Sequence, residues 1–365
     1  MICSPKNGRL TFTTSGNTMK LTQLTLLASI AFGASTSVFA ATTLNGAGAT
    51  FPYPVYAKWA EAYQKETGVQ INYQAIGSGG GIRQIEANTV DFGGTDAPLD
   101  VSELKKESMI QFPMVMGGIV PVVNIPQVKA GELKLTGDVL ANIYLGKIKN
   151  WNDTAIAKLN PNEDLPNLPI YVVHRSDGSG TTYNFTDYLS RVSPDWKAQV
   201  GVGKDINWPS AATDIGGKGN AGVANYVNRT KGSIGYVEYA YATQNHLAYT
   251  QMKNKSGQFV NPTAESFQAA AANADWANAP GFKLILNDQP GKATWPMTSA
   301  TFILMHKNQE DLAKAQEMLK FFTWSYDHPE MAQGLDYVAM PESVVKLVNT
   351  TWQKNLVSHG QPVVR

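Results

Sequence analysis

The sequence predicts an α/β protein, and three observations support this prediction. Short apolar runs alternate with amphipathic helical segments, as strands and helices do in a layered fold. Of the 365 residues, 43% are hydrophobic and 16% are charged, which is a globular composition. Three strand-like segments end in a turn rich in Gly, Ser and Thr that leads into a helix. A chain of this length is expected to form about two domains.

The first 40 residues are predicted to be removed from the mature protein. Met19–Ala40 combines a basic start at Lys20, an apolar stretch and small residues before its end, which is typical of a secretory signal peptide. The apolar stretch is too short to span a bilayer. Residues 1–18 are interpreted as an upstream extension, and the mature chain is predicted to begin near Ala41.

Charge and cysteine content argue against several classes of function. Removal of Lys6, Arg9 and Lys20 leaves 27 of the 30 basic residues against 29 acidic ones. No basic stripe points to nucleic acid. The single cysteine, Cys3, is removed as well, so neither a disulfide nor a thiolate metal site is expected. No cluster of His, Asp or Glu has metal-ligand spacing, and no cofactor is predicted.

The mature chain begins with strand–turn–helix units. A helix is predicted over residues 54–66, because its apolar residues share one face, and Gly68 ends it. Residues 69–77 alternate as a strand and lead into a helix at 78–89. The next strand lies within residues 90–99 and ends in a turn.

The rest of the chain continues this alternation. Residues 169–173 form an apolar strand, and the helix after it places apolar side chains at spacings i, i+3, i+4 and i+7 from Phe185 to Val192. Further predicted elements are buried strands at 117–124 and 298–307 and helices at 135–146 and 310–327.

Two of the buried strands are candidate crossings between two lobes. They are Ile119–Asn124 and Ala300–His306. The first lobe would then hold residues 41–124 plus 300–365, and the second would hold residues 125–299.

Three corners share the order strand, polar turn, helix: Gly46–Pro54, Ile76–Gln84 and Arg175–Phe185. The free N–H groups of a helix's first turn attract an anion, glycine lets the backbone approach closely, and hydroxyls add donors. A fourth corner offers Asp96 at the end of a strand. Taken singly, each corner is also explained by helix capping and tight turns. Three corners of one design favour a shared anionic ligand.

None of these corners is a nucleotide-binding motif. Phe51 and Ile82 stand where a dinucleotide-binding fingerprint has its third glycine. No Gly-Lys-Ser/Thr sequence follows any of the corners, which excludes a P-loop.

The segment RSDGSGTTYNF adds a specific anion-binding feature. Arg175 presents a planar fork of donors that suits two oxygens of a tetrahedral oxyanion. Asp177 could orient this guanidinium, or it could serve as a cap or turn residue. Ser179, Gly180 and Thr181 would present hydroxyl and N–H groups at the start of the next helix.

Catalysis is the less favoured interpretation of this segment. A hydrolase elbow has glycine two residues before its serine, whereas Asp177 stands two residues before Ser179. The five histidines show no spacing that marks a catalytic base. We therefore expect a binding protein and not an enzyme. An exported phosphatase or hydrolase that uses Ser179 or Asp96 is the alternative.

Five segments resemble, in the same order, the phosphate-binding protein of bacterial high-affinity phosphate ABC transporters. They are GAGATFPYPVYAKWAEAYQKETG, IGSGGGIRQI, VDFGGTDAPL, LANIYLGKIKNWND and VHRSDGSGTTYNF. The resemblance spans essentially the whole mature chain. It implies a type II periplasmic binding protein fold, with two α/β lobes joined by a hinge and a ligand cleft between them. It also implies capture of inorganic phosphate, monobasic or dibasic, and its delivery to an inner-membrane permease. We expect a monomer located in the periplasm.

The resemblance also implies which residues hold phosphate. Arg175 matches the family's sole cationic contact, Asp177 matches that arginine's partner, and Asp96 matches a carboxylate that faces the ligand. Gly79 stands where the family often has serine, beside a ligand position. The implied phosphate ligands are Ala49, Thr50, Phe51, Ser78, Asp96, Arg175, Ser179, Gly180 and Thr181.

A carboxylate in an anion site has a physical explanation. Near neutral pH phosphate retains at least one proton, because its second pKa is about 6 to 7. Ionised Asp96 can accept a hydrogen bond from that proton, whereas sulfate has no proton to offer. A buried charged group left without a partner costs more than about 1–3 kcal/mol. Asp96 therefore argues against the remaining alternative, a binding protein for another tetrahedral oxyanion such as sulfate or molybdate.

Overall fold

The computed structural model describes residues 42–209 and 214–364. The part of the chain that follows residue 40 is one compact α/β unit. The predicted signal peptide and its cleavage site lie outside the described residues. The strands are β1 (Thr43–Gly48), β2 (Gln70–Ala75), β3 (Phe92–Thr95), β4 (Met109–Val123), β5 (Lys134–Leu135), β6 (Tyr171–Arg175), β7 (Asp214–Gly217), β8 (Ser233–Glu238), β9 (Ala248–Tyr249), β10 (Gln251–Lys253), β11 (Phe259–Val260), β12 (Thr298–His306), β13 (Val338–Ala339), β14 (Val357–Ser358) and β15 (Gln361–Pro362).

The helices alternate with these strands along most of the chain. They are α1 (Tyr53–Thr67), α2 (Ser78–Glu86), α3 (Val101–Lys106), α4 (Gly137–Tyr144), α5 (Thr154–Ala157), α6 (Gly180–Val192), α7 (Pro194–Gln199), α8 (Gly219–Arg229), α9 (Tyr239–Gln244), α10 (Ala264–Ala271), α11 (Leu312–Asp327), α12 (Pro329–Gln333) and α13 (Glu342–Asn355), with short 3-10 turns η1 (Trp276–Asn278) and η2 (Pro280–Phe282). The predicted α/β class is confirmed.

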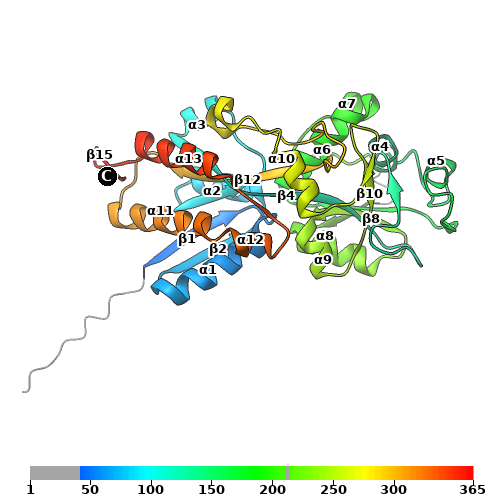
Figure 1. Ribbon diagram of the computed structural model, residues 1–365, viewed down its shortest axis with the longest axis horizontal. Helices are drawn as coiled ribbons and strands as arrows, with labels where there is room; N and C mark the ends of the chain where they lie inside the picture. Colours follow the sequence, from blue (N-terminus) through cyan, green and yellow to red (C-terminus); the bar gives the residue numbers. More distant parts are fainter. Residues whose placement is uncertain (1–41, 210–213, 365) are drawn as a thin grey trace, which may run out of the picture. The chain divides into compact units, whose positions relative to one another are not determined.

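The long strand β4 joins two halves of the main sheet. The strand order is β2-β1-β3-β12-β4-β8-β6-β7. The first part of β4 pairs with β12, and its last residues, Ile119–Val123, pair with β8. All 15 residues of β4 are buried. Helices α1, α2, α11 and α13 accompany the half that contains β1, and α6, α8 and α9 accompany the half that contains β8 (Figure 1). This is the two-lobed arrangement of a periplasmic binding protein.

Within each half the strands that precede the predicted corners run parallel. β1 pairs in parallel with β2 and with β3, and β6 pairs in parallel with β7 and β8. Parallel strands direct their carboxyl ends to one edge of a sheet, where ligands bind in open α/β folds. The polar corners that follow β1, β2, β3 and β6 therefore lie at such edges.

Local sequence signals explain where the first helix begins and ends. The predicted helix 54–66 is observed as Tyr53–Thr67, with Pro54 in its first turn, where a missing N–H costs nothing. Gly68 ends the helix with a φ of 78°, and its N–H donates to the carbonyl oxygen of Gln64. The buried residues Val55 and Trp59 lie on the face that packs inward.

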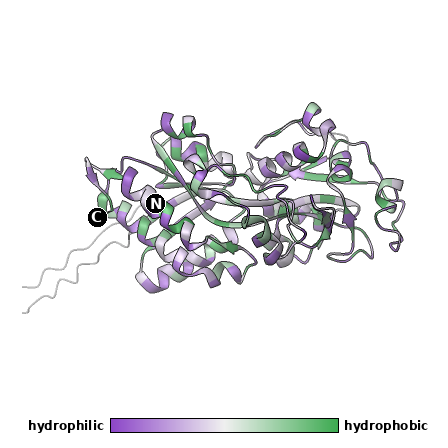
Figure 2. Ribbon diagram, turned by 45° about the horizontal axis from the view of Figure 1, so that its top comes forward, coloured by the Kyte–Doolittle hydropathy of each residue, from purple (hydrophilic) through white to green (hydrophobic). Residues whose placement is uncertain are grey.

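The core runs along the sheet, as the hydrophobic residues on the central strands indicate (Figure 2). Close packing between α2 and β1 depends on glycine. A Cβ atom on Gly81 would lie 2.5 Å from the Cα atom of Gly48 and 2.6 Å from the carbonyl oxygen of Ala47. These are backbone atoms, so a side chain cannot move aside to make room. Gly81 thus lets helix α2 bring its N-terminus close to the end of β1.

This contact predicts an unusual response to an alanine substitution. In an unconstrained helix, Gly→Ala stabilises by about 0.5–1 kcal/mol. At Gly81 we expect Gly81→Ala to lower the unfolding free energy by about 1–3 kcal/mol, because the methyl group overlaps the backbone of β1. Urea unfolding measures this change, with the exposed Glu86→Ala on the same helix as control. A Gly81→Ala protein at least as stable as the wild type would contradict this packing.

Candidate functional site

The predicted polar corners meet in one buried region between the two halves of the sheet. Thr50 follows β1, Ser78 begins α2, Asp96 follows β3 and Arg175 ends β6. All four are 6% exposed or less. Strand β6 extends two residues beyond the predicted 169–173, so the guanidinium of Arg175 projects from the strand end itself.

Ser78 lies at the centre of this region and contacts groups from both halves. Its Oγ accepts hydrogen bonds from the N–H of Gly180 at 3.1 Å and from the N–H of Asp96 at 3.2 Å. It also lies 3.4 Å from Oδ2 of Asp96, to which it donates. Nearby, the N–H of Gly79 donates to the carbonyl oxygen of Gly178 at 2.8 Å. The second and third corners are therefore in direct contact.

Glycine at position 180 is required for this approach. A Cβ atom there would lie 2.5 Å from Oγ of Ser78 and 2.7 Å from Oδ2 of Asp96. Both distances are shorter than van der Waals contact allows. The site therefore closes only because Gly180 carries no side chain.

Asp96 is the acceptor of the site. Asp96 is only 1% exposed, and its Oδ1 atom has no hydrogen-bond partner among the described residues. Burial raises the pKa of the Asp96 carboxyl to about 7, although Thr301, the Arg175 guanidinium and Ser78 act to lower it. The buried hydroxyl of Thr301 lies close enough to the carboxyl to lower its pKa, but it forms no well-aligned hydrogen bond with Asp96 among the described residues. A group that donates a hydrogen bond to Oδ1 would therefore satisfy a costly buried acceptor.

Arg175 and Asp177 form a bidentate ion pair. Nε donates to Oδ1 at 2.8 Å and Nη2 donates to Oδ2 at 2.5 Å. Of the two roles open for Asp177, this is the orienting one, and Asp177 also accepts from the N–H of Gly219 at 3.0 Å. Burial would raise the pKa of Asp177, but the Arg175 guanidinium and the Gly219 N–H outweigh burial and lower it. The remaining nitrogen, Nη1, reaches Oγ1 of Thr181 at 3.3 Å.

Helix α6 begins at this site. Ser179 is its N-cap, since its Oγ accepts from the N–H of Thr182 at 3.0 Å. The helix has 13 residues, so its first turn directs free N–H groups and the positive end of its dipole at the site. Oγ1 of Thr181 accepts from Arg175 and from Nδ2 of Asn220, each at 3.3 Å.

Residues from the half that contains β8 form hydrogen bonds with the first corner, Gly46–Pro54. Oγ1 of Thr50 accepts from the N–H of Asn220 at 3.1 Å and from its Nδ2 at 2.8 Å. The carbonyl oxygen of Thr50 accepts from the hydroxyl of Tyr241 at 2.7 Å. Ala49 and Phe51 flank Thr50 and are fully buried.

Asn220 is a site residue that the sequence interpretation missed. Its Oδ1 accepts from the N–H of Glu238 at 2.9 Å, while its Nδ2 bridges Thr50 and Thr181. It lies at the start of α8, directly after β7 and the glycine-rich turn GGKG. This is the same strand–turn–helix signature as in the three recognised corners, so the signal was present in the sequence.

A second missed feature is the buried pair of Tyr337 and Glu238. The hydroxyl of Tyr337 lies 2.7 Å from Oε2 of Glu238 and 2.7 Å from the carbonyl oxygen of Phe51. Burial raises the pKa of Glu238 well above its usual value. The pair links β8 to a residue near the C-terminus, and no local motif marks either partner.

The described part of the chain offers no catalytic or metal-binding constellation beside Ser179. No group of three His, Cys, Asp or Glu side chains in the described residues could hold a metal ion. The ring of His174 contacts Asp214 and the carbonyl oxygen of Arg175, and not a serine. Among the described residues no helix is long and apolar enough to cross a membrane.

A groove opens beside the buried site. It has a volume of about 590 Å³, and its walls come from both halves of the protein. Thr50 and Tyr53 line one side, and Asp177, Lys218 and Tyr241 line the other. Since Thr50 and Asp177 also belong to the buried region, the groove connects that region with the surface.

Comparisons with known proteins agree with this architecture. Residues 33–328 match the family described as PBP superfamily domain. The chain is 52% identical over 339 residues to the phosphate-binding protein PstS of Pasteurella multocida, covering 93% of this chain and 98% of that protein. It is 39% identical over 322 residues to the PstS protein of Methanocaldococcus jannaschii, covering 82% of this chain and 83% of that protein.

Solved structures share the fold at lower identity. A phosphate-binding protein from Stenotrophomonas maltophilia is 19% identical, with a TM-score of 0.66 over 88% of this chain and 97% of that chain. The periplasmic phosphate-binding protein PfluDING, solved with bound phosphate, is 20% identical, with a TM-score of 0.70 over 88% of this chain and 98% of that chain. Together with the relatives of higher identity, these matches show that the chain belongs to the PBP superfamily and, within it, to the family of PstS phosphate-binding proteins.

Proposed function

We propose that this protein captures inorganic phosphate between its two lobes and delivers it to an ABC-type phosphate importer. The observation that carries the proposal is a buried site that gathers N–H, hydroxyl and guanidinium donors and also holds one acceptor, Oδ1 of Asp96, that has no hydrogen-bond partner among the described residues. The names of the relatives, which are phosphate-binding proteins, support the same ligand.

The proposed donors are those of the polar corners. Arg175 supplies the one guanidinium, and the first turn of α6 supplies N–H groups at Gly180 and Thr181. The hydroxyls of Thr50, Ser78, Ser179 and Thr181 and the N–H groups of Thr50 and Phe51 complete the set, whereas the N–H of Ala49 donates to the carbonyl oxygen of Gly94 at 2.9 Å. Several of these donors and acceptors contact each other, as Gly180 and Ser78 do. Phosphate oxygens would take over such hydrogen bonds when the lobes separate to admit the ion and then close around it.

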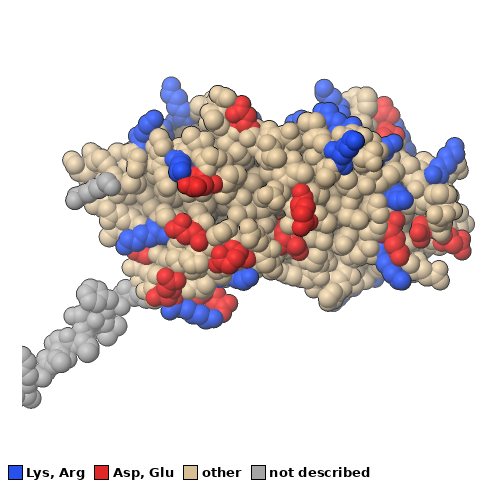
Figure 3. Space-filling model, viewed as in Figure 1, with Lys and Arg blue, Asp and Glu red and all other residues tan. Residues whose placement is uncertain are grey.

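The site would hold phosphate by short-range hydrogen bonds and not by a large net positive charge. Asp177 already offsets the charge of Arg175, because the two side chains form a bidentate pair. On the face shown in Figure 3 acidic and basic side chains are interspersed. Short-range donors and the dipole of α6 would therefore hold the anion.

Asp96 and phosphate would share one proton. The pKa of the Asp96 carboxyl is raised to about 7 by burial, close to the second pKa of phosphate. Dibasic phosphate with protonated Asp96 and monobasic phosphate with ionised Asp96 hold the same number of protons. Either form satisfies Oδ1. Sulfate brings no proton at this pH, so it would either set its lone pairs against the ionised carboxylate or require Asp96 to take up a proton from solvent.

Closure of the lobes is part of the proposal. We assign residues 41–124 plus 300–365 to the first lobe and residues 125–299 to the second. The hinge would lie where the chain crosses between the lobes, near residues 124 and 300. The end of β4 at Val123 and the start of β12 at Thr298 support these crossings. The hydrogen bonds between Ser78 and Gly180 and between Thr50 and Asn220 then join the two lobes. A permease could recognise the closed, liganded form.

We further propose that the protein acts as a periplasmic monomer without catalytic activity. The signal-peptide pattern of Met19–Ala40 supports export. The capping role of the Ser179 Oγ supports binding over nucleophilic attack. Isothermal titration with phosphate, sulfate and a phosphate ester tests the function. Phosphate should bind and return unchanged, whereas turnover of the ester would favour the hydrolase alternative.

The role of Asp96 predicts the selectivity of an amide variant. Asp96→Asn can donate as well as accept, so it should accommodate sulfate and narrow the phosphate-over-sulfate affinity ratio by about tenfold or more. Competition titration measures this ratio, with the exposed Asp164→Asn as control. An unchanged ratio in Asp96→Asn would remove the carboxylate from the explanation of selectivity.

The raised pKa of Asp96 also predicts how stability depends on pH without phosphate. The unfolded state ionises near pH 4 and the folded state only near pH 7, so stability should fall as pH rises between these values. The difference corresponds to about 4 kcal/mol at most. Urea unfolding at pH 5 and pH 8 should show a smaller fall for Asp96→Asn than for the wild type. The raised pKa of Glu238 acts in the same direction, so Asp96→Asn should keep part of the fall in stability between pH 5 and pH 8. An equal fall in the variant and the wild type would contradict a raised pKa for a buried Asp96.

The contact at Gly180 predicts that binding depends on close approach of the lobes. Gly180→Ala should weaken phosphate binding by about ten- to a hundredfold, because its methyl group would overlap Ser78 and Asp96. Isothermal titration measures the loss. Ser190→Ala, on the same helix but away from its N-terminus, is the control. If Gly180→Ala bound phosphate as tightly as the wild type, close contact of the lobes at Gly180 would not be needed for binding.

A further inference from the structure

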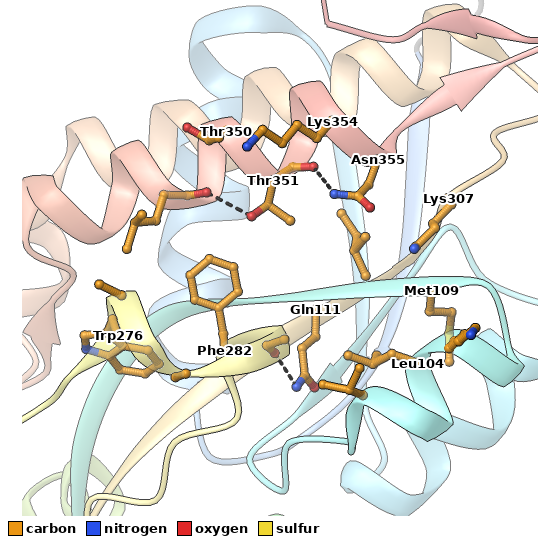
Figure 4. Close-up of a pocket in the computed structure, with 17 residues that line it drawn as sticks. Leu104, Met109, Gln111, Trp276, Phe282, Lys307, Thr350, Thr351, Lys354 and Asn355 are labelled. Atoms are coloured by element: carbon orange, nitrogen blue, oxygen red, sulfur yellow. Dashed lines mark hydrogen bonds between the residues drawn. The ribbon is translucent and has the colours of Figure 1, made fainter.

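A second cavity lies apart from the candidate phosphate site. It has a volume of about 580 Å³ and shares no residue with that site. Helix α3, the start of β4, the turns η1 and η2, the end of β12 and helix α13 form its walls (Figure 4). A volume of this size is ordinary for a small-molecule site.

One part of the cavity wall is apolar. Leu104, Met109, Trp276 and Phe282 are buried residues that line it, and Leu347 of α13 adds a partly buried side chain. Figure 4 shows the rings of Trp276 and Phe282 on one side of the space and Leu104 and Met109 on the other. Such a wall can bury a hydrocarbon or aromatic group.

The charged residues that line the cavity are all basic. They are Lys105, Lys307 and Lys354, and no Asp or Glu is among the lining residues. None of these three lysines takes part in an ion pair within the described residues. Around Lys105 the acidic side chains are engaged elsewhere, since Glu107 pairs with Lys106, Asp100 pairs with Lys283, and the Glu103 carboxylate accepts from the N–H of Asp100.

The uncharged polar side chains of the wall use their donors within the protein. Nε2 of Gln111 donates to the carbonyl oxygens of Leu99 and Gly281. The hydroxyl groups of Thr350 and Thr351 and the Nδ2 of Asn355 donate to carbonyl oxygens of α13. The indole N–H of Trp276 has no partner but is fully buried. The donors left for a ligand are the three ammonium groups.

We propose that this cavity binds an amphiphilic organic anion. The apolar wall would bury its hydrocarbon or aromatic body, and Lys105, Lys307 and Lys354 would pair with its carboxylate or phosphate head group. Lysine stems can lie along the apolar wall while their ammonium groups reach the anion. A bound anion would supply the counter-charge that these three lysines lack in the described ion pairs. This site is independent of phosphate capture by Asp96 and Arg175.

Decanoate is a suitable probe, with decanol as a neutral molecule of equal chain length. Titration of the mature protein should be done with phosphate present at a saturating concentration, so that the phosphate site is occupied. We expect the wild type to bind decanoate. The triple variant Lys105→Gln, Lys307→Gln and Lys354→Gln should bind it about tenfold more weakly, because it lacks the partly exposed ammonium groups that would pair with the carboxylate.

A matched variant separates the local effect from net charge. Lys129→Gln, Lys158→Gln and Lys197→Gln remove three exposed, unpaired lysines elsewhere in the described chain, and this triple variant should bind decanoate as the wild type does. Both variants should retain phosphate affinity, which shows that they are folded. The proposal is overturned if decanoate does not bind to the wild type, if decanol binds equally well, or if both triple variants lose the same affinity.

Discussion

The cost of burying the Asp96 carboxylate is the constraint on which the rest of the site depends. The residue is 1% exposed, and burial raises the pKa of its carboxyl to about 7. Its neighbours offer few donors to it, because the guanidinium of Arg175 is already paired with Asp177. An oxyanion that keeps a proton resolves this conflict by donating to Asp96 while it accepts from every other group. In the proposed function, selectivity for such an ion would come from this one acceptor.

Residues proposed to bind the ligand also hold the two halves of the protein together. Ser78 accepts from Gly180, and Thr50 accepts from Asn220, so the walls of the site are also the contact between lobes. Tyr337 and Glu238 extend this contact towards the C-terminus. If the proposed site is correct, binding and closure would therefore use the same hydrogen-bonding groups. Glycine is required where backbone meets side chain across this contact, as the distances at Gly180 demonstrate.

Much of this arrangement could be predicted from the sequence, because it is encoded locally. The periodicity of α1, the end of the helix at Gly68 and the strand–turn–helix order of the three corners depend on neighbouring residues. The contacts of Asn220 and of Tyr337 with Glu238 span 170 and 99 residues, so no local pattern reports them. The glycine-rich start of α8 was nonetheless a usable signal. The cavity beside α3 could not be foreseen, since four separate stretches of the chain form it, at residues 101–111, 276–282, 307 and 347–355.

A crystal structure of the protein with phosphate tests the central claim most directly. The account predicts one phosphate between the lobes, in contact with Ser78, Arg175 and Thr181, with one of its oxygens about 2.5–2.7 Å from a carboxylate oxygen of Asp96, as expected when a proton is shared. Phosphate bound at another place, or an Asp96 side chain turned away from the ion, would contradict it.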